Sequence, residues 1–198
     1  ALVLFVGATM FSLIAIPLFT LAGAIMNSSG ISRRLIAFAS ALFGFIRGGL
    51  AMVSIGTSLF FAEISGSAVA DVAALGSVLI PAMERKGYSK EFAAAVTSSS
   101  ATLAVIIPPS IPMILYAVMS GSSVVEVFVA GIIPGVVGGV LMMAVAYKFA
   151  VRHNYPVEQT FQLSRLWQTF KDASWSLLLP VIILGGIFTG WVTATEGA

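Results

Sequence analysis

Apolar residues occur in long runs along this chain, and short polar or helix-breaking segments divide them. The clearest division lies at 60–71, a polar island within apolar sequence. As α-helices, the flanking runs 48–63 and 67–83 would each rise roughly 24 Å, which is less than the ~30 Å hydrocarbon core of a bilayer. Two half-length helices joined by Ser65-Gly66-Ser67 predict a re-entrant hairpin. Irregular backbone at membrane depth needs cover from protein or water, so the tip should line a site.

A second interruption lies in the run 89–116. Its centre, 106–112, holds Pro108, Pro109 and Pro112. Proline removes an amide donor and clashes with the preceding turn, so a continuous helix is not expected here. The pattern predicts two half-helices with an unwound centre, preceded by a hydroxyl-rich patch at 97–102.

The remaining runs predict further membrane helices and one connector. The expected organisation is transmembrane helices over 1–46 (a scaffold or arm region), the re-entrant hairpin over 47–88, the broken transmembrane helix over 89–119, a transmembrane helix over 120–152, a cytoplasmic interfacial amphipathic connector over 153–172 and a further transmembrane helix over 173–198. Within the first region, 31–46 is expected to return the chain across the membrane. Gly131, Gly135 and Gly139 form a stripe that either permits close helix contact or reflects the frequency of glycine in membrane helices.

Composition restricts the class of protein. Hydrophobic residues make up 59% and charged residues 9%, which excludes a soluble globular core and predicts an all-α polytopic membrane protein. The chain has no Cys, and its single His153 lies in the connector, so a metalloenzyme lacks ligands. The net charge of +2 is too small to indicate nucleic-acid binding. Ala1 lies inside an apolar run, which suggests part of a longer protein.

Basic residues predict the topology. If the hairpin base and the connector share a side, that side holds Arg47, Arg85, Lys86, Lys90, Lys148, Arg152, Arg165 and Lys171, and the opposite side holds Arg33 and Arg34. The positive-inside rule then places the hairpin base of this multi-pass protein in the cytoplasm.

A hairpin tip followed by a broken helix is typical of ion-coupled secondary transporters, whose unwound carbonyls and hydroxyls coordinate Na⁺. The candidate sodium ligands are supplied by Ser65, Gly66 and Ser67 at the tip and by Pro108 and Ser110 at the break. Hard oxygen ligands suit a monovalent ion better than a transition metal.

Four further residues are candidates for substrate binding or ion coupling. Asp71 lies one turn after Ser67 and either balances the charge of an ion or stabilises its helix N-terminus. Glu63 has a coupling role or pairs with a charge on another helix. Thr102 contacts substrate or ion, or only bonds to its own helix. Pro109 completes the double proline, which disrupts the helix more than a kink requires.

The chain resembles the large membrane (M) subunit, of the DctM type, of tripartite ATP-independent periplasmic (TRAP) transporters. The matching segments are Ile16-Pro-Leu-Phe-Thr-Leu-Ala-Gly23, Gly48-Gly-Leu50, Ile64-Ser-Gly-Ser67, Ile80-Pro-Ala-Met83, Gly87-Tyr88, Ile107-Pro-Pro-Ser110, Ala130-Gly-Ile-Ile-Pro-Gly135 and Thr195-Glu-Gly197, together with Gly76. The resemblance implies a Na⁺-driven elevator-type transporter of the ion-transporter superfamily, built from inverted repeats. Its implied partners are a small membrane subunit, separate or fused, and a soluble periplasmic substrate-binding protein.

The same resemblance places Ser65, Ser67 and Asp71 in the ion and substrate region of the first hairpin, and 108–110 at the facing break. Many members have a small or hydroxyl residue in place of Asp71 and Ala in place of Glu63. The combination in this chain, Phe61-Ala-Glu-Ile-Ser-Gly-Ser-Ala-Val-Ala-Asp71, resembles the sialic-acid branch more than the dicarboxylate branch. Bacterial import of an organic acid is therefore what the resemblance implies, into the cell across the inner membrane, with sialic acid favoured and C4-dicarboxylate next. Only the first repeat and the start of the second are covered, so transport by these residues alone is not expected.

Three other classes remain as alternatives. A binding-protein-independent elevator-type anion/Na⁺ symporter would show the same two interruptions. An intramembrane serine protease would use Ser65, but Glu63 stands where its motif needs Gly and no base is in reach. A structural scaffold would not need two broken elements.

Overall fold

In the computed structural model, which describes residues 11–193, 195 and 196, the chain is α-helical and no strand occurs among these residues. The helices are α2 (Phe11–Ser28), α3 (Ile31–Phe43), α4 (Gly49–Ser65), α5 (Ala68–Arg85), α6 (Lys90–Ala101), α7 (Leu103–Ile106), α8 (Ile111–Ser120), α9 (Val124–Arg152) and α10 (Leu163–Phe188). Residues 1–10 of the expected first segment and Gly197 lie outside the described residues. The segments Lys90–Ser120, Val124–Arg152 and Leu163–Phe188 are long and apolar enough to cross a membrane, as expected of a polytopic membrane protein.

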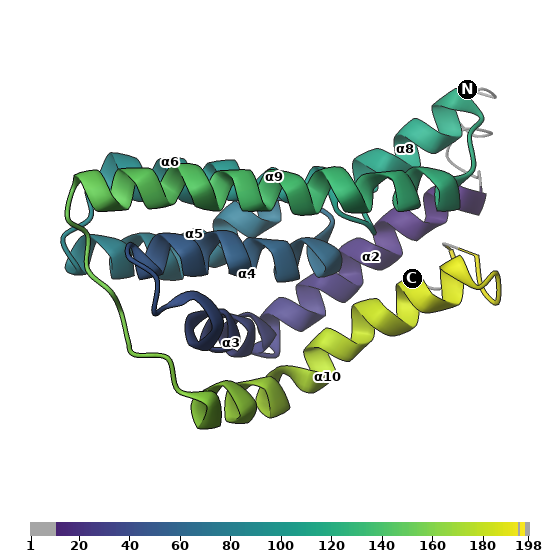
Figure 1. Cartoon of the computed structure of the whole chain (residues 1–198). Coiled ribbons are helices and arrows are strands. Elements are labelled where there is room, and N and C mark those ends of the chain that lie inside the picture. The colour runs from purple at the N-terminus through teal and green to yellow at the C-terminus, as the bar shows by residue number, and fades with distance from the viewer. Residues whose placement is uncertain (1–10, 194, 197–198) are drawn as a thin grey trace.

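The helices are arranged around the hairpin of α4 and α5 (Figure 1). α6 packs on both hairpin helices and α9 packs on α4, while α3 contacts α4 from another side. α10 contacts α3, and α2 crosses from α3 towards α8. The main core therefore lies between the hairpin, α3, α6 and the second half of α9, with Phe61, Met52 and Leu79 fully buried.

A smaller core lies near the start of α9 and the end of α10. It joins Phe19 of α2, Ile114 of α8, Phe128 of α9 and Ile187 of α10. Because α8 packs on both α2 and α9, this cluster fixes the second half of the broken helix against these two helices.

α3 differs from the expectation that 31–46 crosses the membrane. The helix has 13 residues, which rise roughly 20 Å, and Figure 1 shows it nearly end-on while α4 and α9 lie in the plane of the picture. Leu35, Phe38 and Ala39 are buried against the hairpin, and Arg33 lies beside Ala73–Val78, halfway along α5. Arg33 therefore lies beside the middle of the hairpin, and the side of the membrane on which Arg33 and Arg34 lie stays a prediction. The course of α3 follows from its short, amphipathic character, with a polar face that favours an orientation across its neighbours.

The connector also differs from the expectation. Residues 154–162 have no helix, and α10 runs from Leu163 to Phe188 without a break at 172–173. A separate amphipathic helix followed by a membrane helix is therefore wrong. The sequence between Leu163 and Pro180 contains neither Gly nor Pro, so nothing ends the helix there.

The glycines at spacing four in α9 are sites of close approach. A Cβ on Gly139 would lie 2.8 Å from Leu59 Cδ2 of α4, and a Cβ on Gly135 would lie 2.6 Å from Ile107 Cγ1. A Cβ on Gly131 would overlap Met113 and the carbonyl oxygen of Ile106. The stripe therefore packs against the hairpin and the broken helix.

Candidate functional site

The hairpin tip is built by one glycine and two serines. α4 ends at Ser65, and Gly66 has φ 56° and ψ 14°, a left-handed conformation that favours glycine. Ser67 is the N-cap of α5, and its hydroxyl accepts a hydrogen bond from the amide of Ala70 at 3.5 Å. The turn folds Ser65 back over the start of α5, where its Oγ accepts from the amide of Ser67 at 3.2 Å.

Asp71 lies in the first turn of α5 and is completely buried. The hydroxyl of Ser65 donates to Asp71 Oδ1, whereas Oδ2 has no hydrogen-bond partner among the described residues. The sequence pairs Asp71 with Ser67 on one helix face. In the structure the carboxylate bonds to Ser65 instead, because the Ser67 side chain caps the helix. An ionised carboxylate at this depth needs a counter-charge or more donors than it has here.

The broken helix is unwound at 107–110. α7 ends at Ile106, Ile107 is extended with φ −81° and ψ 127°, and Pro108-Pro109 is a cis peptide. Ser110 is the N-cap position of α8, but its hydroxyl donates to the carbonyl of Val105 at 2.8 Å. Both prolines and Ser110 are buried. The break is therefore a covered, irregular segment, as expected of backbone that lines a site.

The tip and the break are in direct contact. The amide of Ile111 donates to the carbonyl of Gly66 at 3.4 Å. A Cβ on Gly66 would lie 3.0 Å from the carbonyl oxygen of Pro109 and 3.5 Å from Ser110 Cα. The structure thus brings together Ser65, Gly66, Ser67, Asp71 and the segment 108–110, which are distant in the sequence.

Glu63 lies near this cluster but on a different face of α4. Side chains of residues two positions apart on an α-helix project about 200° apart, so Glu63 and Ser65 point to different sides of α4. Glu63 is half-buried. The role of Glu63 stays a prediction.

Thr102 is not brought to the tip. Its side chain is exposed, and its hydroxyl donates to the carbonyl of Ser99 at 2.6 Å, as the structural alternative expects. A role for Thr102 in binding stays a prediction.

Two buried hydroxyl pairs join α4 to α6. Ser58 Oγ lies 2.9 Å from Ser100 Oγ, and Ser54 Oγ lies 3.4 Å from Thr97 Oγ1. The sequence indicates the hydroxyl-rich patch at 97–102 but does not identify its partners on α4. The signal was present, since residues 54 and 58 are one turn apart in an apolar run.

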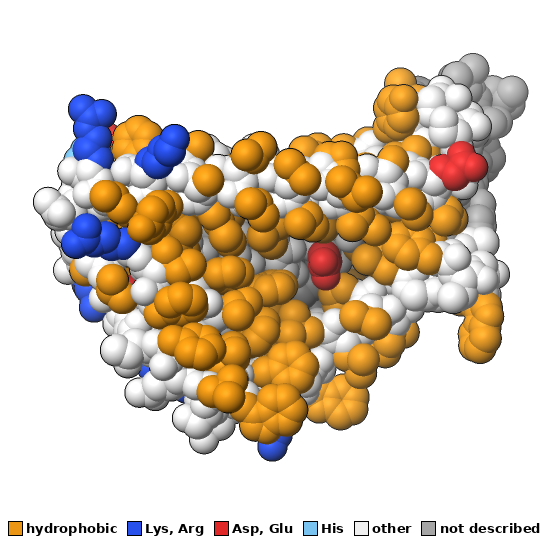
Figure 2. All heavy atoms as spheres, in the orientation of Figure 1, with side chains coloured by type: hydrophobic (Ala, Val, Ile, Leu, Met, Phe, Trp, Pro, Cys, Tyr) orange, Lys and Arg blue, Asp and Glu red, His pale blue; other side chains and the backbone are white. Residues whose placement is uncertain are grey.

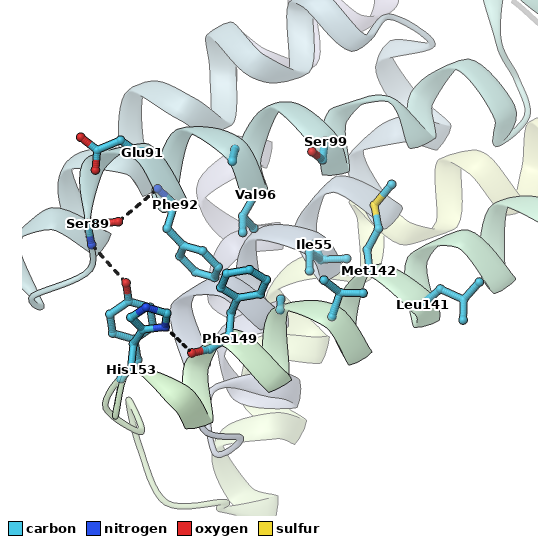
Figure 3. A pocket seen from close by; sticks show the side chains of 14 residues that line it. Ile55, Ser89, Glu91, Phe92, Val96, Ser99, Leu141, Met142, Phe149 and His153 are labelled. Atoms are coloured by element: carbon cyan, nitrogen blue, oxygen red, sulfur yellow. Dashed lines mark hydrogen bonds between the residues drawn. The ribbon is translucent and has the colours of Figure 1, made fainter.

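A large, mainly apolar cavity lies elsewhere. A groove of about 700 Å³ runs between α6 and α9 and is lined mainly by apolar side chains, including Phe92, Val96, Met142 and Phe149 (Figure 3). It lies towards the hairpin base rather than the tip. Its walls lack the convergent oxygen atoms that an ion requires, so the tip and the break remain the candidate ion site.

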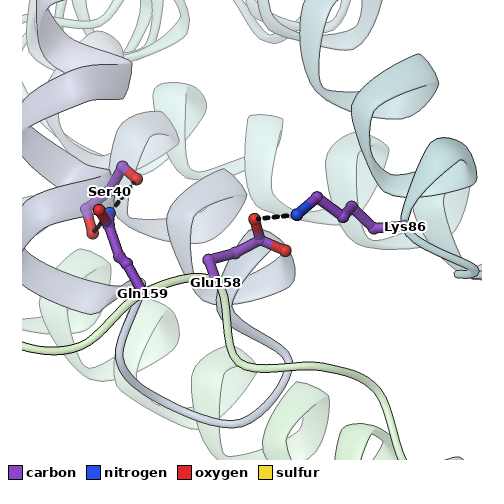
Figure 4. Close-up of polar contacts among 4 residues, drawn as sticks. All are labelled: Ser40, Lys86, Glu158 and Gln159. Carbon is purple, nitrogen blue, oxygen red and sulfur yellow. Dashed lines mark hydrogen bonds and ion pairs between the residues drawn. The ribbon is translucent and has the colours of Figure 1, made fainter.

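Polar contacts at the hairpin base hold the connector in place (Figure 4). Lys86 Nζ lies 3.4 Å from Glu158 Oε2, and Gln159 Nε2 donates to Ser40 O at 2.7 Å and Ser40 Oγ at 2.6 Å. The amide of Gly48 also donates to the carbonyl of Pro156 at 3.1 Å. These contacts join α3, the hairpin and the start of the connector.

The donor set at the tip defines what it can bind. Hydroxyls, backbone carbonyls and one carboxylate are hard oxygen ligands, which suit Na⁺ better than a transition metal. Among the described residues there is no group of three or more His, Cys, Asp or Glu that could hold a metal ion. A hairpin tip that contacts a broken helix is the arrangement used by ion-coupled membrane transporters.

Comparison with known proteins identifies the family. The family model for the DctM component of tripartite ATP-independent periplasmic transporters matches residues 1–198, and the chain belongs to this family. It is a family of transporter components and not of enzymes.

Named relatives transport different organic acids. The C4-dicarboxylate large permease protein DctM of Pseudomonas aeruginosa is 43% identical over 198 residues, which are 100% of this chain and 46% of that protein. The isethionate permease protein DctMQ of Oleidesulfovibrio alaskensis is 41% identical over 199 residues (100% of this chain and 31% of that protein). The sialic acid permease protein SiaT of Haemophilus influenzae is 40% identical over 188 residues (95% and 30%). The chain spans less than half the length of these relatives.

Proposed function

We propose that this chain forms part of the large membrane subunit of a TRAP transporter that imports an organic acid in symport with Na⁺. The contact between the hairpin tip and the helix break is the observation that carries the proposal. In this account the tip and the break supply the oxygen ligands of one Na⁺ site.

Asp71 is the central residue of the proposed site. It is a fully buried carboxylate, and among the described residues only the hydroxyl of Ser65 donates to it, which leaves Oδ2 without a hydrogen-bond partner there. A bound Na⁺ would balance its charge and bind to Oδ2. Ser65 would orient the carboxylate, and Gly66 would allow the tip to approach the carbonyl of Pro109 closely enough for both segments to contribute ligands.

The substrate class follows from the relatives. The three relatives are named for C4-dicarboxylate, isethionate and sialic acid, all of which are small organic anions. Their identities of 43%, 41% and 40% are too similar to select one of them. The preference for sialic acid stays a prediction that rests on the tip sequence at 61–71.

The proposed system has two further proteins, a small membrane subunit and a periplasmic substrate-binding protein, and it works in the bacterial inner membrane. We propose that the hairpin base lies in the cytoplasm, and the basic residues that gather at the end of the molecule where α9 ends (Figure 2) support this orientation. The change of side during transport would follow an elevator mechanism.

The test is uptake by proteoliposomes that contain the complete transporter, assayed with radiolabelled sialic acid and C4-dicarboxylate. We expect accumulation of one of them under an inward Na⁺ gradient, and only when the cognate substrate-binding protein is added. Accumulation that persists when the Na⁺ gradient is collapsed would contradict the coupling. Equal uptake without the binding protein would instead favour an independent anion/Na⁺ symporter.

A further inference from the structure

The groove between α6 and α9 is long, apolar and open on the outer face of the long helix. Its wall on α9 extends from Leu141 to His153, a rise of roughly 18 Å, close to half of the ~30 Å hydrocarbon core. Leu141 and Val145 are exposed beside it. In a membrane protein, an apolar surface of this kind suits contact with acyl chains, and the length of the groove is close to the thickness of one leaflet.

Aromatic rings close the end of the groove at the hairpin base. The ring centroids of Tyr88 and Tyr155 are 4.2 Å apart, and those of Phe92 and His153 lie 5.3 Å and 5.7 Å from Tyr155. Burial raises the pKa of the Tyr88 phenol to about 12, so Tyr88 stays neutral. The amide of Ser89 donates to the hydroxyl of Tyr155 at 3.4 Å, which ties the start of α6 to this cluster. Tyr88 and Tyr155 are themselves buried, so the cluster forms a packed apolar end wall of the groove.

The charged residues around the hairpin-base end of the groove favour the binding of an anion there. Lys148 and Arg152 are exposed in the last turns of α9, next in sequence to groove residues Phe149 and His153. Glu91 also lines the groove, but Figure 3 shows its carboxylate directed away from the rings. Basic residues outnumber acidic ones at the hairpin-base end of the molecule. The basic residues are Arg47, Arg85, Lys86, Lys90, Lys148 and Arg152, and the acidic residues are Glu84, Glu91 and Glu158, of which Glu158 is paired with Lys86.

We propose that this groove binds one acyl chain of an anionic phospholipid whose headgroup lies at Lys148 and Arg152. The apolar walls fit the chain, the length fits one leaflet, and the basic residues fit the charge of the headgroup. This site is separate from the tip, so it stands independently of the proposed transport function.

The experiment uses the purified full-length permease with its small subunit, delipidated in detergent. Phosphatidylglycerol and phosphatidylcholine with identical acyl chains are titrated separately, and bound lipids are counted by native mass spectrometry. We expect tighter binding of the first phosphatidylglycerol than of phosphatidylcholine, by about fivefold for each basic residue near the headgroup. In Lys148→Gln/Arg152→Gln this preference should disappear while phosphatidylcholine binding is unchanged.

A second variant tests the groove itself. Ala95 is exposed and lines the groove, so Ala95→Phe should fill the groove without disturbing the core and weaken the binding of both lipids. Ala94→Phe changes an exposed neighbour outside the lining and should bind like the wild type. The charge control is Arg165→Gln/Lys171→Gln on exposed positions of α10, which should keep the preference.

Three outcomes would overturn the proposal. The first is the same affinity for both lipids in the wild type. The second is an equal loss of preference in the α10 control, which would indicate general surface electrostatics. The third is unchanged binding of both lipids by Ala95→Phe, as expected if another protein segment covers the groove in the complete transporter.

Discussion

Gly66 decides how closely the hairpin tip approaches the helix break. Its left-handed backbone turns the chain between α4 and α5, and its missing side chain leaves room for the carbonyl of Pro109. Other residues strain at this backbone conformation by about 1–2 kcal/mol. The tip therefore depends on glycine for two separate reasons, of which only the second concerns the site.

A comparison of Gly66→Ala with Gly121→Ala distinguishes the effect of backbone strain from the effect of close contact with Pro109. Both glycines have positive φ, but a Cβ on Gly121 meets nothing within 4 Å. We expect both variants to lower the free energy of unfolding by about 1–2 kcal/mol, measured as a lower melting temperature of the purified permease. Only Gly66→Ala should also weaken Na⁺-dependent uptake, by about tenfold. Similar uptake by the two variants would show that close contact with Pro109 is unimportant.

The residues of the tip could be predicted from the sequence, but one of their contacts could not. Length and helix breakers located Ser65–Ser67 and 108–110, because a helix that is too short to cross a membrane must turn. The bond from Ser65 to Asp71 depends on the conformation of Gly66 and on the capping role of Ser67, which helical spacing alone does not reveal.

At the scale of elements, buried hydroxyls link the first hairpin helix to the broken helix. Ser100 Oγ lies within hydrogen-bonding distance of Ser58 and of the carbonyl of Thr97 at 3.1 Å. Since Ser100 has one proton, a bond to Thr97 leaves Ser58 to donate to Ser100. Interhelical hydrogen bonds of this kind hold membrane helices together.

A double-mutant cycle tests this link. Ser58→Ala, Ser100→Ala and the double variant should show a coupling free energy of about 0.6 kcal/mol in unfolding measurements on the purified permease. The control cycle pairs Ser58→Ala with Ser98→Ala, because Ser98 is exposed and bonds within its own helix. A coupling no larger than that of the control would mean that the pair does not hold α4 to α6.

The glycine face of α9 is the other link to the break. Gly131→Ala would place a methyl group against the backbone of Ile106, which cannot move away as a side chain can. We expect a loss of about 1–3 kcal/mol in the free energy of unfolding. Gly138→Ala is the control, because its Cβ would lie 3.4 Å from Leu103 Cδ2, an ordinary contact. Equal melting temperatures for the two variants would contradict the packing.

The courses of α3 and α10 show where sequence reasoning on elements failed. Hydrophobicity identified both segments, but α3 is amphipathic and ends at Phe43, so it packs across the hairpin. α10 has no breaker near Asp172, so the polar start and the apolar continuation form one helix. Apolar content predicts that a segment is buried or in the membrane, whereas orientation depends on its packing partners.

At the scale of the whole molecule, residues 154–162 connect the bundle to α10 without helical structure. Gln159 anchors this connector to Ser40 of α3, and Glu158 pairs with Lys86 at the hairpin base. The start of α10 is thus positioned by a few polar contacts together with its packing on α3.

Gln159→Leu should release the connector. Loss of its hydrogen bonds should favour local opening by about 1 kcal/mol, and limited proteolysis at 154–162 should become about fivefold faster. Gln168→Leu, at an exposed position in α10, is the matched control and should be cleaved at the wild-type rate. Equal cleavage rates for both variants would show that Gln159 does not hold the connector.

The central claim is that the tip and the break form a Na⁺ site around Asp71. Its most direct test is the melting temperature of the purified full-length permease, titrated with NaCl against choline chloride, since an ion that binds the folded state stabilises it. We predict that the wild type is stabilised by Na⁺ and that Asp71→Asn is not, while Asp172→Asn, an exposed acid on α10, behaves like the wild type. The same Na⁺-dependent stabilisation in Asp71→Asn as in the wild type would contradict the account.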